Sequence, residues 1–425
     1  MSLGAESGDD RTFVVIGASL AGGKAAETLR EEGFTGRLVL VGEETEPPYE
    51  RPPLSKGFLA GAEPREKAFL HDEAWYAEHD IELRLGSRAT MLDAATHAVT
   101  LDGVEQLGYD KLLLATGSRV RRLDVPGNDL HHVRYLRTIN ESEALLRQLR
   151  DGAASRVVVV GAGWIGMETA AAARGHGADV TVVELDTLPL HRVLGEEVGA
   201  LFRDLHEAHG VRFRFGTGVR EFRGDAAGNL TTVVLADGTE LPADLAIVGI
   251  GIAPATELAE AAGLTVDDGV VTDPALRTSD PDIYACGDVA STPNSVAGQR
   301  IRVEHWSNAL NGGPAAARSM LGQDVAYDRV PYFFSDQYDL GMEFSGWFPP
   351  GEHERMVFRG DPALVDGKVP EYVAFWLDDR SRVLAGMNVN VWDVAEQIQA
   401  LVRAKRPVDV DRLTDPSVPL SDLAG

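Results

Sequence analysis

The sequence predicts an α/β protein with two Rossmann-like dinucleotide-binding domains and a small C-terminal α+β domain. Two observations predict the repeated domain. An apolar run, a glycine turn, a helical pattern and a second apolar run follow one another between residues 12 and 43, and the same order returns between 156 and 184. The third observation is a change of character from residue 328, where aromatic residues alternate as they do in antiparallel strands.

The first repeat opens with residues 12–16 (TFVVI), an apolar run long enough for a buried parallel strand. A helix is expected over 23–32, and a second strand over 37–41 (RLVLV). Strand, helix and strand in this order form the βαβ unit that binds an adenine dinucleotide.

The turn of the first repeat has the residue types that phosphate binding needs. Gly17 permits a tight turn, and Gly22 lets the helix pack close to the sheet. Ser19 stands where a glycine is usual, but it keeps the N–H group and adds little bulk. Backbone N–H groups and the helix N-terminus favour a pyrophosphate, and Glu43, roughly 20 residues further on, can accept hydrogen bonds from a ribose. The alternative is a turn with a structural role only.

The second repeat has all three glycines of this fingerprint. A strand over 156–160 (RVVVV) leads into the turn 161–166 (GAGWIG), and a helix is expected over 167–176. A second strand over 179–183 then ends at Glu184. Two such units in one chain predict two different bound dinucleotides.

Composition limits the classes of function. At 425 residues the chain can hold two or three domains, and its formal net charge of −26 argues against general affinity for nucleic acid or acidic membranes. No apolar run approaches the length of a membrane span, and residues 1–10 lack the features of a signal peptide, although they suit a disordered tail. The single cysteine, Cys286, excludes an intrachain disulfide and fits a cytoplasmic location.

Further elements are expected along the chain. Four prolines should hold 47–56 extended and stiff, so that Arg51 and Lys56 project from a constrained loop. Residues 67–103 have the pattern of mixed helix and strands that end in a hairpin, and 213–222 with 230–235 of a second hairpin. Other strands are expected at 109–115, 245–251 and 282–285, and helices at 135–150 and 304–321.

The C-terminal domain is expected to be a sheet with one helix. Residues 331–347 and 372–391 alternate like antiparallel strands, with a turn at 378–379, and 360–369 is expected to be a surface loop. One face of the following helix is apolar, through Val394, Ile398, Leu401 and Val402.

Short motifs narrow the class. Thr116-Gly117 and Gly287-Asp288 each follow a buried strand, and with the two glycine turns the chain resembles two-dinucleotide flavoprotein reductases of the glutathione-reductase-like fold. The motifs 51–56 (RPPLSK), 135–138 (YLRT) and 334–338 (FSDQY) are similar to those of NADH-dependent ferredoxin reductases of oxygenase systems, the family of putidaredoxin reductase and biphenyl dioxygenase ferredoxin reductase. The resemblance covers nearly everything from residue 11 onward.

The resemblance implies that 11–122 with 253–327 binds FAD, that 123–252 binds NAD, and that 328–425 is the C-terminal domain. Residues that would contact the pyrophosphate, adenosine, ribityl chain or ring of FAD are Gly17, Ala18, Ser19, Ala21, Gly22, Glu43, Arg51, Lys56, Ala89, Thr116, Gly117, Arg137, Gly287, Asp288 and Trp306. Residues that would contact NAD are Gly161, Gly163, Trp164, Ile165, Gly166, Glu168, Glu184, Arg192 and Gly251. No metal site is implied.

Two of these residues are the implied catalytic pair. Lys56 is expected near the flavin N5, paired with Glu168 from the second glycine-turn helix. Such a pair would position both side chains and stabilise negative charge on reduced flavin. The alternative is a plain salt bridge with no catalytic role.

The cysteine content separates the chain from its disulfide-reducing neighbours. Glutathione- and thioredoxin-reductase-like enzymes need a cysteine pair, and coenzyme A disulfide reductases and NADH peroxidases need a cysteine where this chain has 51–56. Cys286 is instead expected to be a small buried core residue.

The resemblance implies an enzyme that passes a hydride from NADH to FAD and then single electrons to an iron–sulfur ferredoxin, of the two-iron, two-sulfur type, that feeds a terminal oxygenase. NADH is expected over NADPH, because Glu184 would accept a bond from a ribose hydroxyl and repel a 2′-phosphate. Rubredoxin reductase, a monodehydroascorbate-reductase-like enzyme and an interaction protein like apoptosis-inducing factor remain alternatives. The last of these would need a basic face, which the charge of −26 disfavours.

An acidic ferredoxin and this acidic chain would repel at long range, so docking would depend on a local basic patch. Arg300 and Arg302 are the candidates, extended by Arg403, Lys405 and Arg406. The alternative is that these are ordinary solvated charges.

Overall fold

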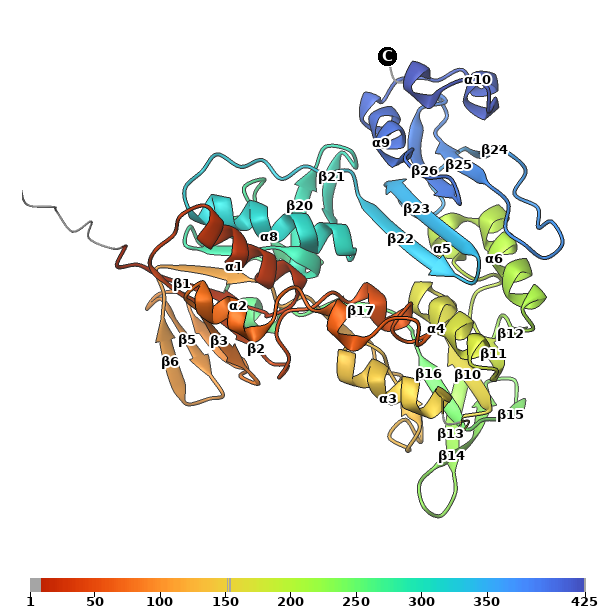
Figure 1. The fold of residues 1–425 in the computed structure, drawn as a ribbon, viewed down its shortest axis with the longest axis horizontal. Coiled ribbons are helices and arrows are strands. Elements are labelled where there is room, and N and C mark those ends of the chain that lie inside the picture. Colours follow the sequence, from red (N-terminus) through yellow and green to blue (C-terminus); the bar gives the residue numbers. More distant parts are fainter. Residues whose placement is uncertain (1–8, 151, 153, 424–425) are drawn as a thin grey trace, which may run out of the picture. The chain divides into compact units, whose positions relative to one another are not determined.

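The computed structural model describes residues 9–150, 152 and 154–423, and the acidic segment 1–8 lies outside the described residues. The chain divides into two compact units (Figure 1). Unit 1 comprises Met1–Glu50, Glu66–Arg119 and Ala253–Pro331, and unit 2 comprises Arg51–Arg65, Val120–Ile252 and Tyr332–Gly425. The division into FAD-binding, NAD-binding and C-terminal domains stays a prediction.

Unit 1 is built on a parallel sheet in the order β19-β7-β1-β2-β3. Its strands are β1 (Thr12–Ile16), β2 (Arg37–Gly42), β3 (Ile81–Leu85), β7 (Lys111–Leu114) and β19 (Ile283–Ala285). Alternate residues of β1 enter two cores, since Phe13 and Val15 pack into one and Val14 and Ile16 into the other. Burial on both faces explains why these strands are continuous apolar runs.

Two helices pack against each other beside this sheet, α1 (Leu20–Glu31) and α8 (Trp306–Met320). They approach closely, because a Cβ at Gly313 would overlap the backbone carbonyl of Ala21. The predicted helix over 23–32 is therefore confirmed, but it begins three residues earlier, directly after Ser19 at the N-cap.

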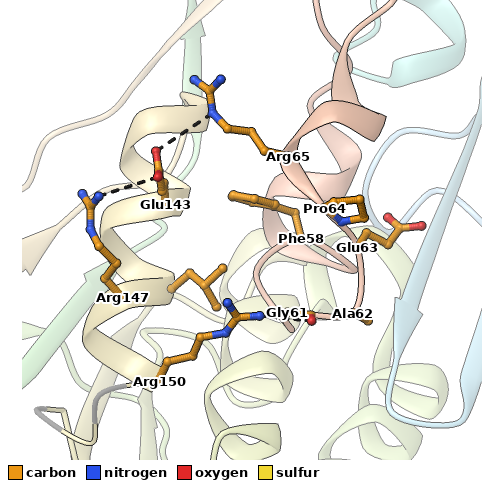
Figure 2. Close-up of a pocket in the computed structure, with 10 residues that line it drawn as sticks. Phe58, Gly61, Ala62, Glu63, Pro64, Arg65, Glu143, Arg147 and Arg150 are labelled. Atoms are coloured by element: carbon orange, nitrogen blue, oxygen red, sulfur yellow. Dashed lines mark hydrogen bonds and ion pairs between the residues drawn. The ribbon is translucent and has the colours of Figure 1, made fainter.

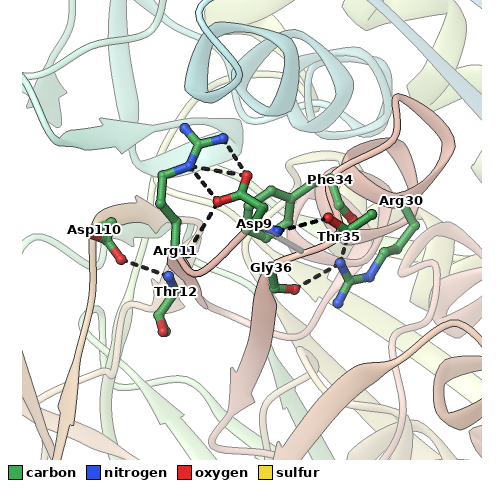
Figure 3. A network of polar contacts seen from close by, with 8 residues as sticks. All are labelled: Asp9, Arg11, Thr12, Arg30, Phe34, Thr35, Gly36 and Asp110. Atoms are coloured by element: carbon green, nitrogen blue, oxygen red, sulfur yellow. Dashed lines mark hydrogen bonds and ion pairs between the residues drawn. The ribbon is translucent and has the colours of Figure 1, made fainter. Parts of the chain in front are cut away.

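Arginines hold the ends of α1 and β1 in unit 1 (Figure 3). The Arg30 guanidinium, at the end of α1, donates to the carbonyl oxygens of Phe34 and Gly36 at 2.5 and 3.0 Å. Arg11 pairs with Asp9 at 2.5 Å, and the Asp110 carboxylate accepts from the Thr12 N–H at 2.7 Å. The bonds from Arg30 satisfy backbone carbonyls in the loop between α1 and β2, and the bond to Asp110 satisfies the first N–H of β1.

Smaller elements complete unit 1. They form an antiparallel sheet β4-β5-β6, a mixed sheet β18-β20-β21, and short helices. Their bounds are β4 (Ala89–Asp93), β5 (Ala98–Leu101), β6 (Glu105–Gly108), β18 (Val270–Val271), β20 (Ala290–Asn294), β21 (Gln299–Arg302), α2 (Glu73–Glu78), α7 (Glu257–Ala261), η2 (Arg65–Ala68, which straddles the unit boundary) and η3 (Gly287–Val289). The chain passes between the units within β8 (Ser118–Val120) and β17 (Ile252–Pro254).

Unit 2 repeats the parallel sheet in the order β12-β11-β10-β16-β9. Its strands are β9 (Val133–Arg134), β10 (Arg156–Val160), β11 (Asp179–Val183), β12 (Arg212–Arg214) and β16 (Leu245–Val248). Its helices are α3 (Ile139–Arg150), α4 (Trp164–Gly175), α5 (His191–Leu194) and α6 (Glu196–Ala208). The first strand of each glycine-turn unit thus occupies the same inner place, between the strand that follows it and a later strand.

The expected hairpin over 213–222 and 230–235 is only half right. The antiparallel sheet contains β13 (Val219–Gly224), β14 (Leu230–Leu235) and β15 (Glu240–Pro242). Phe213 belongs instead to β12, which pairs in parallel with β11, so that Phe213 lies opposite Val182. The apolar pattern is the same in a parallel edge strand and a hairpin strand, and only the pairing separates them.

The C-terminal part of unit 2 is an antiparallel sheet in the order β22-β23-β26-β25-β24, with helices beside it. The elements are β22 (Tyr332–Gln337), β23 (Leu340–Gly346), β24 (Arg355–Arg359), β25 (Tyr372–Leu377), β26 (Val383–Val389), α9 (Ala395–Ala404), α10 (Val410–Thr414) and η4 (Leu420–Leu423). The indole of Trp376, fully buried, donates to the Leu194 carbonyl at 3.1 Å. This bond ties the sheet to the end of α5.

The proline-rich stretch 47–56 departs from the prediction. Pro52–Ser55 forms a 3₁₀ turn, η1, rather than extended chain. Proline fixes φ near the helical value and is common in the first turn of a helix. A Pro-Pro pair is therefore compatible with both an extended chain and a 3₁₀ turn. Leu54 and Ser55 are buried, which shows that this stretch is not a solvated linker.

Among the described residues, no helix is both long enough and apolar enough to cross a bilayer.

Candidate functional sites

The predicted FAD residues of unit 1 gather at one edge of its parallel sheet. Gly17 follows β1, Glu43 follows β2, Thr116 follows β7 and Gly287 follows β19, and these four strands are neighbours. The carboxyl ends of parallel strands point the same way, so the residues that follow them lie along one edge. This is where open α/β sheets bind ligands.

The first turn has the backbone geometry expected of it. Gly17 has a φ of 118°, and its N–H donates to the Val41 carbonyl at 2.8 Å. A Cβ at Gly17 would overlap the Ala115 carbonyl, and a Cβ at Gly22 would overlap that of Gly17. Both positions therefore require glycine.

The N-terminus of α1 fits a phosphate. Ser19 at the N-cap makes no side-chain capping bond, and no acid lies in the first turn of the helix. The first N–H groups of a helix need partners, and their positive potential favours an anion. The donors present thus suit a pyrophosphate group, as the sequence predicts.

Other predicted FAD residues lie around this edge. The Thr116 hydroxyl donates to the Ala255 carbonyl at 2.8 Å, and Gly117 accepts from the Ala255 N–H at 2.9 Å. Gly287 has a φ of 74°, and a Cβ there would lie 3.2 Å from that of Ala21. Ala18 and Ala21 belong to the turn and helix, Asp288 lies on η3, Trp306 is the first residue of α8, and Ala89 begins β4.

The second turn repeats this geometry in unit 2. Gly161 has a φ of 99°, its N–H donates to the Val183 carbonyl at 2.8 Å, and a Cβ at Gly166 would overlap the carbonyl of Gly161. Gly163 is the N-cap of α4, again with no side-chain capping bond and no acid in the first turn. A Cβ at Gly163 would meet no atom within 4 Å. The turn thus combines free space with N–H donors, which suits a second pyrophosphate.

The acidic residue of the second repeat bonds to its own turn. One Glu184 oxygen accepts from the Ala162 N–H at 2.6 Å, and the other accepts from the Asp186 N–H at 2.9 Å. A carboxylate has about four acceptor positions, so two remain for a ribose. Arg192, by contrast, is exposed and pairs with Asp186 at 3.2 Å.

The remaining predicted residues of unit 2 differ in their contacts and exposure. The Arg51 guanidinium donates to the backbone carbonyl of Arg137. Trp164 packs edge-on against Phe202 and Phe333, while Ile165 is exposed. Gly251 has a φ of 96° and lies three residues after β16.

The predicted catalytic pair forms within unit 2. Lys56 Nζ lies 2.8 Å from Glu168 Oε1, and the Glu168 side chain is only 3% exposed. Lys56 also lies 5.3 Å from the centre of the Phe334 ring. A buried carboxylate needs such a partner, since an unpaired buried charge costs several kcal/mol, about 3–5 when one member of a pair is removed.

Two further partners of this carboxylate were not predicted from the sequence. The Ser55 hydroxyl donates to Glu168 Oε2 at 2.5 Å, and the Ser335 hydroxyl donates to Oε1 at 2.7 Å. Both serines are buried. They lie inside the family motifs 51–56 and 334–338, which marked this region as functional. The motifs did not indicate that the two serines bond to Glu168.

The surroundings of Lys56 also affect Asp336, the acid next to Ser335. Desolvation raises the pKa of Asp336, although the Lys56 ammonium opposes this shift. A second acidic group near Lys56 is thus easier to protonate than usual.

The expected docking patch is partly wrong. Arg300 donates to the backbone carbonyls of Thr272 and Ser291, and the Arg302 side chain is 11% exposed and pairs with Asp268 and Glu304. These two arginines hold unit 1 together instead of presenting charge to a partner. Arg403, Lys405 and Arg406 are exposed at the end of α9.

A pocket of about 580 Å³ lies elsewhere in unit 2 (Figure 2). Residues 58–65 and α3 line it, with Arg65 and Arg147 both beside Glu143, at 4.0 and 3.6 Å. None of the predicted cofactor residues lines it.

Two glycine turns, each at the carboxyl edge of a parallel sheet and each followed by an acid, define a protein that binds two dinucleotides. Comparison with known proteins gives the family. Residues 11–313 match the pyridine nucleotide-disulphide oxidoreductases, and residues 332–424 match the reductase C-terminal domain.

Similar proteins of known name agree. The chain is 40% identical over 408 residues to the ferredoxin–NAD(+) reductase component of an anthranilate 1,2-dioxygenase system from Burkholderia cepacia, covering 96% of this chain and 98% of that protein. It is 38% identical over 414 residues to putidaredoxin reductase from Pseudomonas putida, covering 96% of each. Among solved structures, the covalent putidaredoxin reductase–putidaredoxin complex contains a chain with a TM-score of 0.91 and 37% identity, covering 97% of this chain and 98% of that one.

The chain therefore belongs to the pyridine nucleotide-disulphide oxidoreductases, and within them to the ferredoxin–NAD(+) reductases. It is a flavoprotein enzyme whose cofactors are FAD and NAD(H). The predicted fold class is confirmed, with glutathione-reductase-like flavoprotein reductases as structural neighbours.

Proposed function

We propose that this chain carries electrons from NADH to an acidic ferredoxin of the two-iron, two-sulfur type, which in turn feeds a terminal oxygenase. The observation that carries the proposal is the identity of 38–40%, over nearly the whole chain, to the ferredoxin–NAD(+) reductase component of a dioxygenase system and to putidaredoxin reductase. A cytoplasmic location belongs to the same proposal, because the single cysteine suits a reducing compartment.

The first turn, with Glu43, Thr116, Gly117, Gly287 and Asp288, would hold FAD. The second turn, with Glu184, would hold the nicotinamide dinucleotide. Ala89, Arg51, Arg137 and Trp306 would complete the first site, and Trp164, Ile165, Arg192 and Gly251 the second. The strand-end positions, and the helix starts that have neither a side-chain cap nor an acid in the first turn, support this assignment.

Lys56 and Glu168 would set the charge beside the flavin ring. When bound, FAD accepts a hydride from NADH and gives up electrons singly. The Lys56 ammonium would stabilise negative charge that develops on the ring, and Glu168 would keep the ammonium in place. The burial of Glu168 and its three close donors support a positioned pair over an incidental surface salt bridge.

Docking of an acidic ferredoxin would use exposed basic residues. The cluster Arg403, Lys405 and Arg406 suits this role, because local opposite charge overcomes the long-range repulsion of two acidic proteins. Reversing Arg403 and Arg406 to glutamate should raise the apparent KM for ferredoxin and leave NADH reduction of ferricyanide unchanged. An unchanged KM for ferredoxin would exclude this cluster as the docking face.

The overall proposal is tested by acceptor specificity. The purified holoenzyme is given NADH and cytochrome c, with and without a two-iron, two-sulfur ferredoxin, and in parallel with rubredoxin and monodehydroascorbate. Fast cytochrome reduction that depends on the ferredoxin is expected. Rubredoxin or monodehydroascorbate as the better acceptor would favour that alternative, and slow NADH oxidation with every acceptor would favour a redox interaction protein.

A further inference from the structure

A continuous chain of side chains in unit 2 ends at the Glu168 carboxylate, and the proposed reaction does not use most of it. Tyr338 Oη lies 3.3 Å from His206 Nδ1, and His206 Nε2 lies 2.8 Å from Gln337 Oε1. Gln337 Nε2 lies 3.1 Å from the Ser335 hydroxyl, which lies 2.7 Å from Glu168 Oε1. We call these four residues, Tyr338, His206, Gln337 and Ser335, the relay.

The relay and the Glu168 carboxylate at its end connect three elements that are distant in sequence. Glu168 lies on α4, His206 lies on α6, and Ser335 and Gln337 lie on β22, with Tyr338 just beyond it. The strand alternation places Ser335 and Gln337 on the same face of β22, two residues apart. The relay therefore depends on the packing of α4 against β22 and on the hydrogen bond from α6 to β22 within unit 2.

The hydrogen bonds of the relay have one direction. An ionised carboxylate only accepts, so the Ser335 hydroxyl donates to Glu168 and must accept from the Gln337 amide. The Gln337 oxygen then accepts from His206, which must carry its proton on Nε2. Every donor thus points toward the Glu168 charge, and bonds aligned in this way strengthen one another.

Three of the four relay residues are buried, so the direction of their hydrogen bonds is not averaged by exchange with water. His206 and Ser335 are 0% exposed and Gln337 is 1% exposed, so none of the three exchanges its bonds with water. Desolvation lowers the pKa of His206 to about 4; the hydrogen bond to Gln337 opposes this shift, and the neighbouring His209 adds to it. The groups that face His206 are Gln337, Tyr338 and His209, and none of them is a carboxylate that would favour an imidazolium. A neutral imidazole can accept from Tyr338 and donate to Gln337 at the same time, whereas an imidazolium cannot.

We propose that Ser335, Gln337 and His206 are positioning residues that hold the Glu168 carboxylate in one orientation, and through it the Lys56 ammonium. This inference rests on the proposed role of Lys56 and Glu168 at the flavin. It adds that the reactivity of that pair is set from α6 and β22, by residues outside the predicted cofactor-binding set.

The first experiment tests the relay itself, without turnover. In ¹⁵N-labelled holoenzyme, imidazole NMR should show His206 neutral, with its proton on Nε2, between pH 8 and pH 5. In Gln337→Glu, the new carboxylate should raise the pKa of His206 so that it becomes charged in this range. A wild-type His206 that carries its proton on Nδ1, or that titrates near pH 6.5, would overturn the proposal.

The second experiment tests whether the relay acts on the flavin. Flavin reduction by NADH is followed by stopped flow in wild type, Ser335→Ala, Glu168→Gln and the double variant, with the flavin midpoint potential measured in each. Ser335→Ala should slow reduction about tenfold, the effect of one lost hydrogen bond to a charged group, and should shift the potential. In the Glu168→Gln background the same substitution should have little further effect.

The results of this double-mutant cycle distinguish failure of the relay proposal from failure of the proposed role of Lys56 and Glu168. If Ser335→Ala slows reduction equally in both backgrounds, the effect is structural and the relay proposal fails, while the role of Lys56 and Glu168 stands. If Glu168→Gln itself changes nothing, the proposed role of the pair fails and the relay proposal fails with it. Gln399→Glu is the matched control, because the Gln399 amide also donates to a serine hydroxyl, Ser345 at 3.2 Å, outside the relay. It should leave the His206 spectrum and the flavin unchanged.

Discussion

The two glycine turns of this reductase share one backbone design and differ in the acid that closes it. In each turn the first glycine has a positive φ, and the last one packs onto the carbonyl of the first. Glu43 after the first turn is 60% exposed, and its nearest cation, Arg88, lies 3.8 Å away. Glu184 after the second turn accepts two backbone N–H bonds at 2.6 and 2.9 Å. The two turns therefore place the same requirement on the backbone, while only the acid of the second turn is fixed by backbone N–H groups.

The largest expected effect comes from the glycines that both turns require. Gly22→Ala and Gly166→Ala each force a Cβ onto a backbone carbonyl, and each should cost about 3 kcal/mol or more of folding free energy. The flavin content separates them, because Gly22→Ala should lose FAD and Gly166→Ala should stay yellow with a raised KM for NADH. Thermal unfolding and FAD release on denaturation measure both. Loss of FAD from Gly166→Ala alone would reverse the assignment of the two turns.

The acids should differ in their effect on cofactor choice. Glu184→Gln removes the charge that repels a 2′-phosphate, so the preference for NADH over NADPH should fall by about tenfold to a hundredfold. Glu43→Gln is the matched change in the other turn and should leave the preference unaltered. The measurement is kcat/KM with each cofactor. An equal response of both variants would show that neither acid governs the choice.

Acid should weaken unit 2 through His206. The native pKa of His206, about 4, lies below the unfolded value of 6.5, so the unfolded state binds the proton first. The stability contributed by neutral His206 is present above pH 6.5 and is lost as the pH falls towards 4. Between pH 7 and pH 5 the loss should be about 2 kcal/mol. Urea unfolding of wild type and His206→Gln at both pH values measures it, and an equal pH dependence in the two proteins would contradict it.

The smallest effect should come from exchanging the middle residues of the turns. Gly163→Ser gives the second turn the residue that the first turn already has, and its Cβ meets no atom within 4 Å. Folding should be unchanged within about 0.5 kcal/mol, and the KM for NADH should rise only a few-fold. A free energy of unfolding as low as that of Gly166→Ala would show that the middle position is as constrained as the last one.

Much of the fold follows from local patterns. The strands at 12–16, 156–160 and 179–183 have the predicted bounds, because an apolar run buried on both faces of a sheet leaves little choice of register. The positive φ of Gly161 and the strands that end shortly before Thr116 and Gly287 agree with the sequence, because glycine conformation and strand ends leave local signatures. The stretch 52–55 and the pairing of Phe213 were wrong because each local pattern suits two structures.

The sequence by itself determined the two βα turns, the class of cofactor and the Lys56–Glu168 pair that the family motifs imply, since these depend on residue types at short spacings or in known motifs. Only the tertiary structure decided which groups surround the carboxylate. Ser55, Ser335, Gln337 and His206 lie on three segments up to 282 residues apart in the chain, and the packing of α4, α6, η1 and β22 brings them together. The tertiary structure also decided the partners of Arg300 and Arg302. Arg300 donates to a backbone carbonyl and Arg302 pairs with carboxylates, because the fold places these acceptors around the two side chains.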